Sequence, residues 1–281
     1  MKYAVLCLLL AAAAIAAIRL YPAGKAAFIL GKAPALNEFT YNIDVNLRRE
    51  NLTEGQTAFA DALSWLLGVE GEKMMALKVT GSYCQDTLYA QITCEGVDEP
   101  LTDIWLSGDS GYMNAKQLYS TIRSRLTGQY SLLEFLLPEW KYEQYISIGQ
   151  IEEIFGISLG QLYALKDSLP EEKGLLIKGF GILASMDGKA DAHGVRFTKS
   201  YETADVLISV SNEDGTAELG FESTFKEEQL TVSGCRAAVS FGNVEAVNRP
   251  DSIMPQEVVD KFAAVWSVLA DLKGKMNELI S

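Results

Sequence analysis

Strict alternation of apolar and polar side chains is the feature of this sequence that most restricts its fold. In FTYNIDVNL, residues 39–47, every second side chain is apolar and every side chain between them is polar. This period of two is typical of a β-strand with one face on a core and the other in solvent. The same rhythm returns in MALKVTGSY (75–83) and TLYAQITCE (87–95), which predict an antiparallel hairpin across a Cys-Gln-Asp turn.

More strands are expected on both sides of the middle of the chain. DIWLSGDSGYMN (103–114) predicts a strand, a Gly-Asp-Ser-Gly turn and a short strand, followed by a helix that Asn114 caps with Gln117 at the third position. ADVLISVS (204–211) and TAELGFESTF (216–225) flank the turn residues Asp214 and Gly215. In QLTVSGCRAAVSF (229–241) the apolar residues change from even to odd positions across Gly234, as a β-bulge requires.

Helical patterns occupy the start, the middle and the end of the chain. Residues 60–68 predict a short amphipathic helix, and residues 131–170 are irregular and helical, with Ser147 and Gln150 suited to a second cap. A long amphipathic helix is expected from Pro255 onward. Without a solenoid repeat or a Pro/Ser-rich linker, we expect one α+β domain over residues 37–281, with a helical insertion around 131–170. Its curved antiparallel sheet would form a half-barrel packed against amphipathic helices.

An apolar segment precedes this domain. Residues 3–18 carry no charge and follow Lys2, which predicts a membrane-targeting helix. Sixteen residues exceed a usual signal core and fall just short of a spanning helix, so length does not separate a signal peptide from a signal-anchor over residues 1–21. We favour a retained anchor, with residues 3–21 in the cell membrane as a single pass and residues 22–36 as a juxtamembrane helix or linker. The main domain would be extracytoplasmic, or secreted if the segment is cleaved.

Composition narrows the partners and the chemistry. A net charge of −13 without a dense run of Lys or Arg argues against nucleic acid as a partner. Besides Cys7 in the apolar run, the chain has Cys84, Cys94 and Cys235, which are expected to be small buried residues; a Cys94–Cys235 bridge is an option in an oxidising compartment. No cofactor and no metal ion are expected, because the acidic 212–215 loop lacks the EF-hand pattern and the chain lacks a glycine-rich phosphate loop.

Catalysis is not expected either. His193 is the only histidine and lies in a turn-rich stretch, and GDSG (108–111) is interpreted as a hairpin turn rather than a nucleophile loop. Paired glutamates at 152–153, 171–172 and 227–228 leave one enzymatic hypothesis, a hydrolase with converging carboxylates. We expect these acids to face solvent, so the sequence predicts a protein that is not an enzyme.

Large apolar side chains remain as candidates for ligand contact. The sheet and the helices could close as an ordinary core or leave a cavity between them, and the same side chains suit both outcomes. The candidate ligand-binding residues are Phe39, Tyr41, Ile43, Val45, Trp105, Phe262 and Trp266.

The order of elements resembles the LolA/LppX-like superfamily of lipoprotein carriers. The resemblance rests on the membrane-targeting start, the FTYNIDV strand, a meander that ends in GYMNAKQLYSTI, and IMPQEVV before the last helix, and it covers about residues 37–260 in outline. It implies an unclosed β-barrel with helices in its opening and non-enzymatic binding of acyl chains or other apolar ligands. The main hypothesis is therefore an anchored extracytoplasmic protein that binds a lipid or another hydrophobic ligand. The alternative is a cell-envelope interaction or scaffold module with a filled core.

Overall fold

The computed structural model describes most of the chain between residues 20 and 260. The described residues are 20–33, 36–48, 57, 61, 64, 67, 69, 70, 73–129, 131–135, 137, 139–155, 179–213, 216–226, 232–242 and 244–260. The strands are β1 (Phe39–Leu47), β2 (Ala76–Cys84), β3 (Thr87–Cys94), β4 (Thr102–Ser107), β5 (Ser110–Asn114), β6 (Tyr145–Ser147), β7 (Asp187–Ala190), β8 (Gly194–Ser200), β9 (Ala204–Glu213), β10 (Thr216–Phe225) and β11 (Val232–Phe241). The named helices are η1 (Lys73–Met75), α3 (Ala115–Gln129), η2 (Ser131–Phe135) and α4 (Ile148–Phe155), and residues 20–30, 179–184 and 256–260 are also helical.

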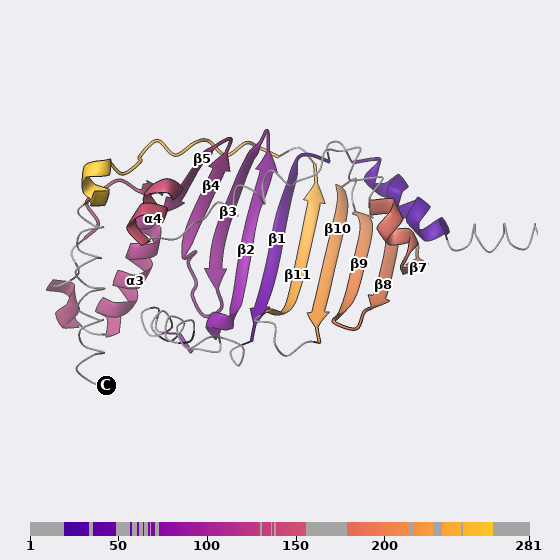
Figure 1. Ribbon diagram of the computed structural model, residues 1–281, viewed down its shortest axis with the longest axis horizontal. Coiled ribbons are helices and arrows are strands. Elements are labelled where there is room, and N and C mark those ends of the chain that lie inside the picture. Colours follow the sequence, from indigo (N-terminus) through magenta and orange to yellow (C-terminus); the bar gives the residue numbers. More distant parts are fainter. Residues whose placement is uncertain are drawn as a thin grey trace, which may run out of the picture.

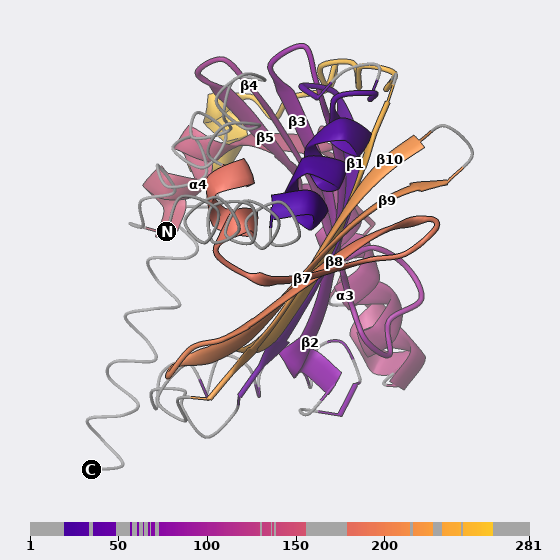
Figure 2. The ribbon, with the colours of Figure 1, turned by 90° about the vertical axis from the view of Figure 1, so that its right-hand side faces the viewer.

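All of these strands belong to one antiparallel sheet of 11 strands in the order β6-β5-β4-β3-β2-β1-β11-β10-β9-β8-β7 (Figure 1). The sheet is open, because β6 and β7 form its two edges and do not pair with each other. Seen from the β7 end, the sheet twists strongly, as an antiparallel sheet of this width must (Figure 2). The α+β class and the open, half-barrel-like antiparallel sheet predicted from alternation are confirmed.

Strand register separates an apolar face from a polar face. Residues directly opposite each other on neighbouring strands point to the same side of a sheet. Ile43 of β1 is opposite Val79 of β2 and Ala237 of β11. Asp44, the next residue, is opposite Lys78 and Arg236. We call the side that carries Ile43 the apolar face and the side that carries Asp44 the polar face.

Local signals in the sequence set the turns and the helix starts. Gln85 and Asp86 both adopt positive φ, 49° and 61°, in the predicted β2–β3 turn. The Asn114 side chain accepts a 2.9 Å hydrogen bond from the backbone N–H of Gln117, so it caps α3 as predicted. Ser147 and Gln150 exchange reciprocal backbone-to-side-chain bonds of 2.9 and 3.1 Å at the start of α4, which is a capping box.

The predicted bulge is also present. Asn46 of β1 pairs with Gly234, but the next residue, Leu47, pairs with Val232, so the register shifts between Asn46 and Leu47. A bulge moves every later side chain to the other face, which explains why the apolar parity of β11 changes at Gly234.

The 20–30 helix covers the apolar face at the β7 end of the sheet. Ala23, Ala26 and Ile29 of this helix are buried in a core with Phe197 and Val210 of the sheet. The 179–184 helix contributes Leu183 to the same core, and both helices lie on one side of the sheet in Figure 2. The segment that the sequence suggested as a juxtamembrane helix or linker, residues 22–36, thus contains most of a helix that packs on the domain.

At the β6 end of the sheet, α3, α4 and the chain after β11 pack against the strands. Leu118 and Ile122 of α3 pack on a small core that includes Leu67 and Leu101. After β11 the chain runs along the sheet to β6 (Figure 1), where the Tyr145 N–H donates to the Ser252 carbonyl at 3.0 Å and the Met254 N–H donates to the Tyr145 carbonyl at 2.7 Å. Strand β6 lies within residues 131–170, where the sequence predicted only helix, because three residues are too few to show an alternation.

The optional disulfide is contradicted. Cys94 is opposite Leu77, Leu77 is opposite Val45, and Val45 is opposite Cys235, so two strands separate the two cysteines. At a strand spacing of roughly 4.8 Å their Cα atoms are about 14 Å apart, whereas a disulfide requires less than about 7 Å. Cys84, Cys94 and Cys235 are free thiols.

Among the residues that the structure describes, no helix is both long enough and apolar enough to cross a membrane. Residues 1–19, which include the predicted targeting segment, lie outside the described residues.

Candidate functional site

Four of the seven candidate ligand-binding residues lie side by side. Phe39, Tyr41, Ile43 and Val45 all project from β1 to the apolar face, and each is half-buried. Phe39 lies at the centre of an aromatic group, with ring centroids 5.4 Å from Tyr83, 6.0 Å from Phe241 and 6.3 Å from Tyr41. The alternation therefore predicted correctly that these four side chains share one face of the sheet.

Trp105 belongs to the opposite side of the sheet. Its neighbour Ile104 continues the apolar row through Ala90 and Gly81 to Tyr41, so Trp105 must face the polar side. There its ring is buried and lies tilted against the Tyr112 ring, with the centroids 5.6 Å apart, and its Nε1 donates to the Val247 carbonyl at 3.0 Å. Trp105 thus anchors the segment after β11 and does not share a site with the β1 residues. Phe262 and Trp266 lie outside the described residues.

Tyr41 reaches across its neighbouring strand. Its hydroxyl donates a 2.9 Å hydrogen bond to the Tyr89 carbonyl on β3. The ring passes close over Gly81, where an added Cβ would lie 1.9 Å from the Tyr89 oxygen and 2.9 Å from the Tyr41 Cζ. Only glycine fits at this close approach. Burial raises the pKa of Tyr41, so the phenol remains a hydrogen-bond donor at neutral pH.

A pocket of about 140 Å³ opens on the apolar face beneath the 20–30 helix. Its walls come from this helix, the 179–184 helix and strands β9 and β10. The lining residues are Ala23, Ala27, Leu30, Gly179, Phe180, Ile182, Leu183, Ile208, Leu219 and Phe221. None of these side chains is polar, and a cavity of roughly 150 Å³ with an apolar lining is large enough for a benzene-sized group.

Sequence analysis did not select the residues of this pocket. Alternation in β9 and β10 could have placed Ile208, Leu219 and Phe221 on the apolar face. The signal on the helix is the pair of alanines Ala23 and Ala27, four residues apart, because small side chains on one helical face leave space above a sheet. No sequence pattern indicates that the 179–184 helix would pack beside them.

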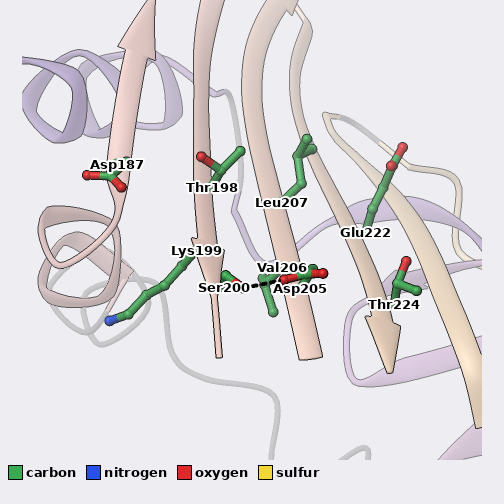
Figure 3. Close-up of a pocket in the computed structure, with 9 residues that line it drawn as sticks. All are labelled: Asp187, Thr198, Lys199, Ser200, Asp205, Val206, Leu207, Glu222 and Thr224. Atoms are coloured by element: carbon green, nitrogen blue, oxygen red, sulfur yellow. Dashed lines mark hydrogen bonds between the residues drawn. The ribbon is translucent and has the colours of Figure 1, made fainter. Parts of the chain in front are cut away.

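A second, polar hollow of about 420 Å³ lies at the other end of strands β7 to β10 (Figure 3). Two of its acidic residues, Asp205 and Glu222, form ion pairs. Asp205 pairs with Lys226 at 2.7 Å and accepts a 2.6 Å bond from Ser200, and these hydrogen bonds lower the pKa of its carboxyl. Glu222 pairs with Arg236 at 3.0 Å. All of these groups are exposed, so the hollow is a solvated surface with ion pairs rather than a desolvated site for acid–base chemistry.

A buried polar network lies on the polar face near β6. Asp103 accepts hydrogen bonds from the Asn114 Nδ2 at 2.7 Å and from the Tyr145 hydroxyl at 2.8 Å. Burial and the neighbouring Asp103 raise the pKa of Tyr145, which remains a donor at neutral pH. Because Asn114 also caps α3, this network joins β4, β5, β6 and the start of α3. These hydrogen bonds hold the four elements together, so the network has a structural role.

Of the three glutamate pairs behind the hydrolase hypothesis, only the pair at 152–153 lies within the described residues. Glu152 and Glu153 lie on α4, and Glu153 accepts a 3.0 Å bond from Gln256 at the surface. The glutamates at 171–172 and 227–228 lie outside the described residues. His193 is in the β7–β8 turn, where its backbone N–H donates to Asp191. Across the described residues, no group of three or more His, Cys, Asp or Glu side chains could hold a metal ion.

No protein-family model matches this chain, and a comparison with curated proteins finds no significantly similar sequence.

Proposed function

We propose that this protein is an extracytoplasmic, membrane-anchored protein that binds a lipid or another hydrophobic ligand without transforming it. The observation that carries the proposal is the pocket beneath the 20–30 helix, because all of its lining side chains are apolar. Removing apolar surface from water provides roughly 25 cal/mol per Å², which is the driving force for an apolar ligand there. The location of the domain follows from the uncharged segment at residues 3–18 and is part of the proposal.

The pocket alone suits a ring or a short alkyl segment. A longer ligand would continue along the apolar face, because Phe221 of the pocket begins a row that runs through Ala237, Ile43, Val79 and Ile92. Each of these side chains is half-buried. Four strand spacings of roughly 4.8 Å make this row about 19 Å long. One acyl chain in a bilayer spans half of a hydrocarbon core of roughly 30 Å, so the row is long enough for an acyl chain.

A photoactivatable fatty acid tests this proposal on the full chain. After irradiation of the membrane-extracted protein with a diazirine-bearing fatty acid, we expect crosslinks at Phe180, Leu219 and Phe221. Substitution of Ala27→Phe fills the pocket and should abolish these crosslinks. Ala238→Phe is the matched control, because Ala238 is exposed on the polar face.

Two results would count against the proposal. Crosslinks that are absent from the pocket and from the Ile43 row, together with no lipid adduct in native mass spectrometry, would favour the scaffold module with a filled core. Equal crosslinking in the Ala27→Phe variant and in the parent would show that the fatty acid binds elsewhere.

A further inference from the structure

The 20–30 helix is apolar on its outer surface as well as on the surface that packs on the sheet. Leu20, Tyr21, Gly24 and Phe28 are exposed, and Tyr21 and Phe28 are 62% and 61% accessible. They recur at the three- and four-residue spacing of one helical face. A helix that serves only as a lid on a core normally turns polar residues to solvent.

The neighbouring 179–184 helix extends this exposed apolar area. Ile182 is 55% exposed, and Phe180 is also exposed. Both residues line the pocket together with Ala27 and Leu30 of the 20–30 helix, so the two helices adjoin there. We call Leu20, Tyr21, Phe28, Phe180 and Ile182 the outer patch.

The segment that carries most of the outer patch differs in charge from the rest of the chain. Residues 1–37 contain Lys2, Arg19, Lys25 and Lys32 and no acidic residue, although the chain has 37 acids in total. Lys32 lies 4.1 Å above the Phe28 ring, and the Lys25 ammonium donates to the Asp191 carbonyl at the rim of β7. Lysines beside exposed aromatic rings are typical of a helix at a membrane interface, where the stems lie in the apolar layer and the ammonium groups reach the headgroups.

The sequence before the patch identifies what covers it. The uncharged run at residues 3–18 ends two residues before Leu20. A segment of this composition requires an apolar surrounding, so the same apolar phase is available to the helix that follows it directly. We propose that the outer patch of the folded domain lies against the surface of an anionic lipid bilayer, with Lys25 and Lys32 at the headgroups. This inference rests on the membrane anchor of the proposed function, and it does not depend on whether the pocket holds a ligand.

Hydroxyl-radical footprinting of the full chain in vesicles of phosphatidylcholine and phosphatidylglycerol tests the contact. The comparison pairs residues of one type within one sample: Tyr21 with Tyr201, and Phe28 with Phe135. Tyr201 is 44% exposed at the far end of β8, and Phe135 is 89% exposed beyond α3. We expect oxidation of Tyr21 and Phe28 to be several-fold slower than their exposure predicts, and oxidation of Tyr201 and Phe135 to follow exposure.

Variants make the result specific to the patch. The double substitution Leu20→Glu and Phe28→Glu changes two patch residues that do not line the pocket, and it should restore rapid oxidation of Tyr21, whereas Phe135→Glu should leave Tyr21 protected. Oxidation of Tyr21 in the parent at or above the rate of Tyr201 would overturn the inference. Protection that disappears on dilution of the protein at constant lipid would also overturn it, because the patch would then be covered by a second copy of the chain. Neither result bears on fatty-acid crosslinking in the pocket.

Discussion

The two ends of the sheet are covered by different kinds of contact, which are buried hydrogen bonds at one end and apolar packing at the other. At the network end, which comprises β4 to β6, α3 and α4, a buried carboxylate receives two hydrogen bonds and the segment after β11 completes the edge. At the pocket end, which comprises β7 to β10 and the 20–30 helix, small side chains of the helix such as Ala23 pack near large side chains of the sheet such as Phe197. Polar networks have few alternative geometries, whereas small residues above a sheet leave space. The comparison indicates one end that is fixed by polar contacts and another end whose packing leaves an apolar pocket.

The largest effect is expected from Phe197→Ala at the pocket end. Phe197 is 1% exposed and packs against the 20–30 helix, so its removal leaves a cavity and should lower the free energy of unfolding by about 4 kcal/mol. Chemical denaturation measures this loss. Thr198→Ala, the adjacent exposed position, is the control and should change stability little. A loss under about 1 kcal/mol for Phe197→Ala would show that this core is loosely packed.

At the network end, Asp103→Ala removes the shared acceptor. The Asn114 amide and the Tyr145 hydroxyl then lose their buried partner, which should cost about 2 to 3 kcal/mol. Hydrogen exchange should accelerate first in β5, β6 and the start of α3, while β8 to β10 stay protected. Asp109→Ala in the exposed β4–β5 turn provides the matched control. Uniform acceleration across the whole sheet would contradict the separation of the two ends.

Alkaline pH should weaken the network end further. Burial and then Asp103 raise the pKa of Tyr145 above the value of about 10 for an exposed tyrosine. The unfolded chain therefore releases this proton at a lower pH than the folded chain does. Stability is fully present below about pH 10 and falls as the pH rises above it.

Tyr145→Phe isolates this contribution. The variant should cost about 1 kcal/mol at neutral pH, because one hydrogen bond to Asp103 is lost. It should also show a shallower loss of stability than the parent above about pH 10, measured by denaturation at several pH values. The Tyr41→Phe variant should separately reduce the slope of stability against pH above about pH 10, since burial also raises the pKa of Tyr41. An unchanged slope in both variants would exclude these phenols as the source.

The smallest effect is expected at the surface of the pocket end. Lys226→Ala breaks an exposed ion pair with Asp205, so the melting temperature should not change measurably. The pKa of Asp205 should nevertheless rise toward its usual value, because the Lys226 hydrogen bond is the largest cause of its lowering. Carboxyl NMR titration detects this rise. A clear drop in melting temperature would give the polar hollow a structural role that its exposure does not suggest.

Local patterns were sufficient for much of the fold. The alternation in FTYNIDVNL predicted β1 and its apolar face, whereas strand register decided which residues of β2 and β11 meet Phe39 and Ile43. Asn114 and Ser147 were identified as caps because capping depends on residues only three positions apart. The bulge near Gly234 was visible as a change of parity. Each of these signals is encoded within about ten residues.

The candidate site was predicted only in part, because it depends on contacts between distant segments. Trp105 was grouped with the β1 residues on its size, but strand register places it on the polar face. The Cys94–Cys235 bridge was compatible with composition and failed because β1 and β2 lie between the two strands. The pocket residues were missed because Ala27 and Phe180 are separated by most of the chain and meet only after the helices pack.

The sequence by itself determined most of the strands, their two faces, the caps, the bulge and an apolar, acid-free start. These properties follow from backbone periodicity and from hydrogen bonds within a few residues, which act before any tertiary contact forms. Only the tertiary structure decided that β1 and β11 join the two halves of the sheet, that Asp103 becomes buried, and that the 20–30 helix and the 179–184 helix form an apolar pocket beside an exposed apolar patch. The physical reason is that burial and empty volume are set by which surfaces meet, and that information is spread over the whole chain.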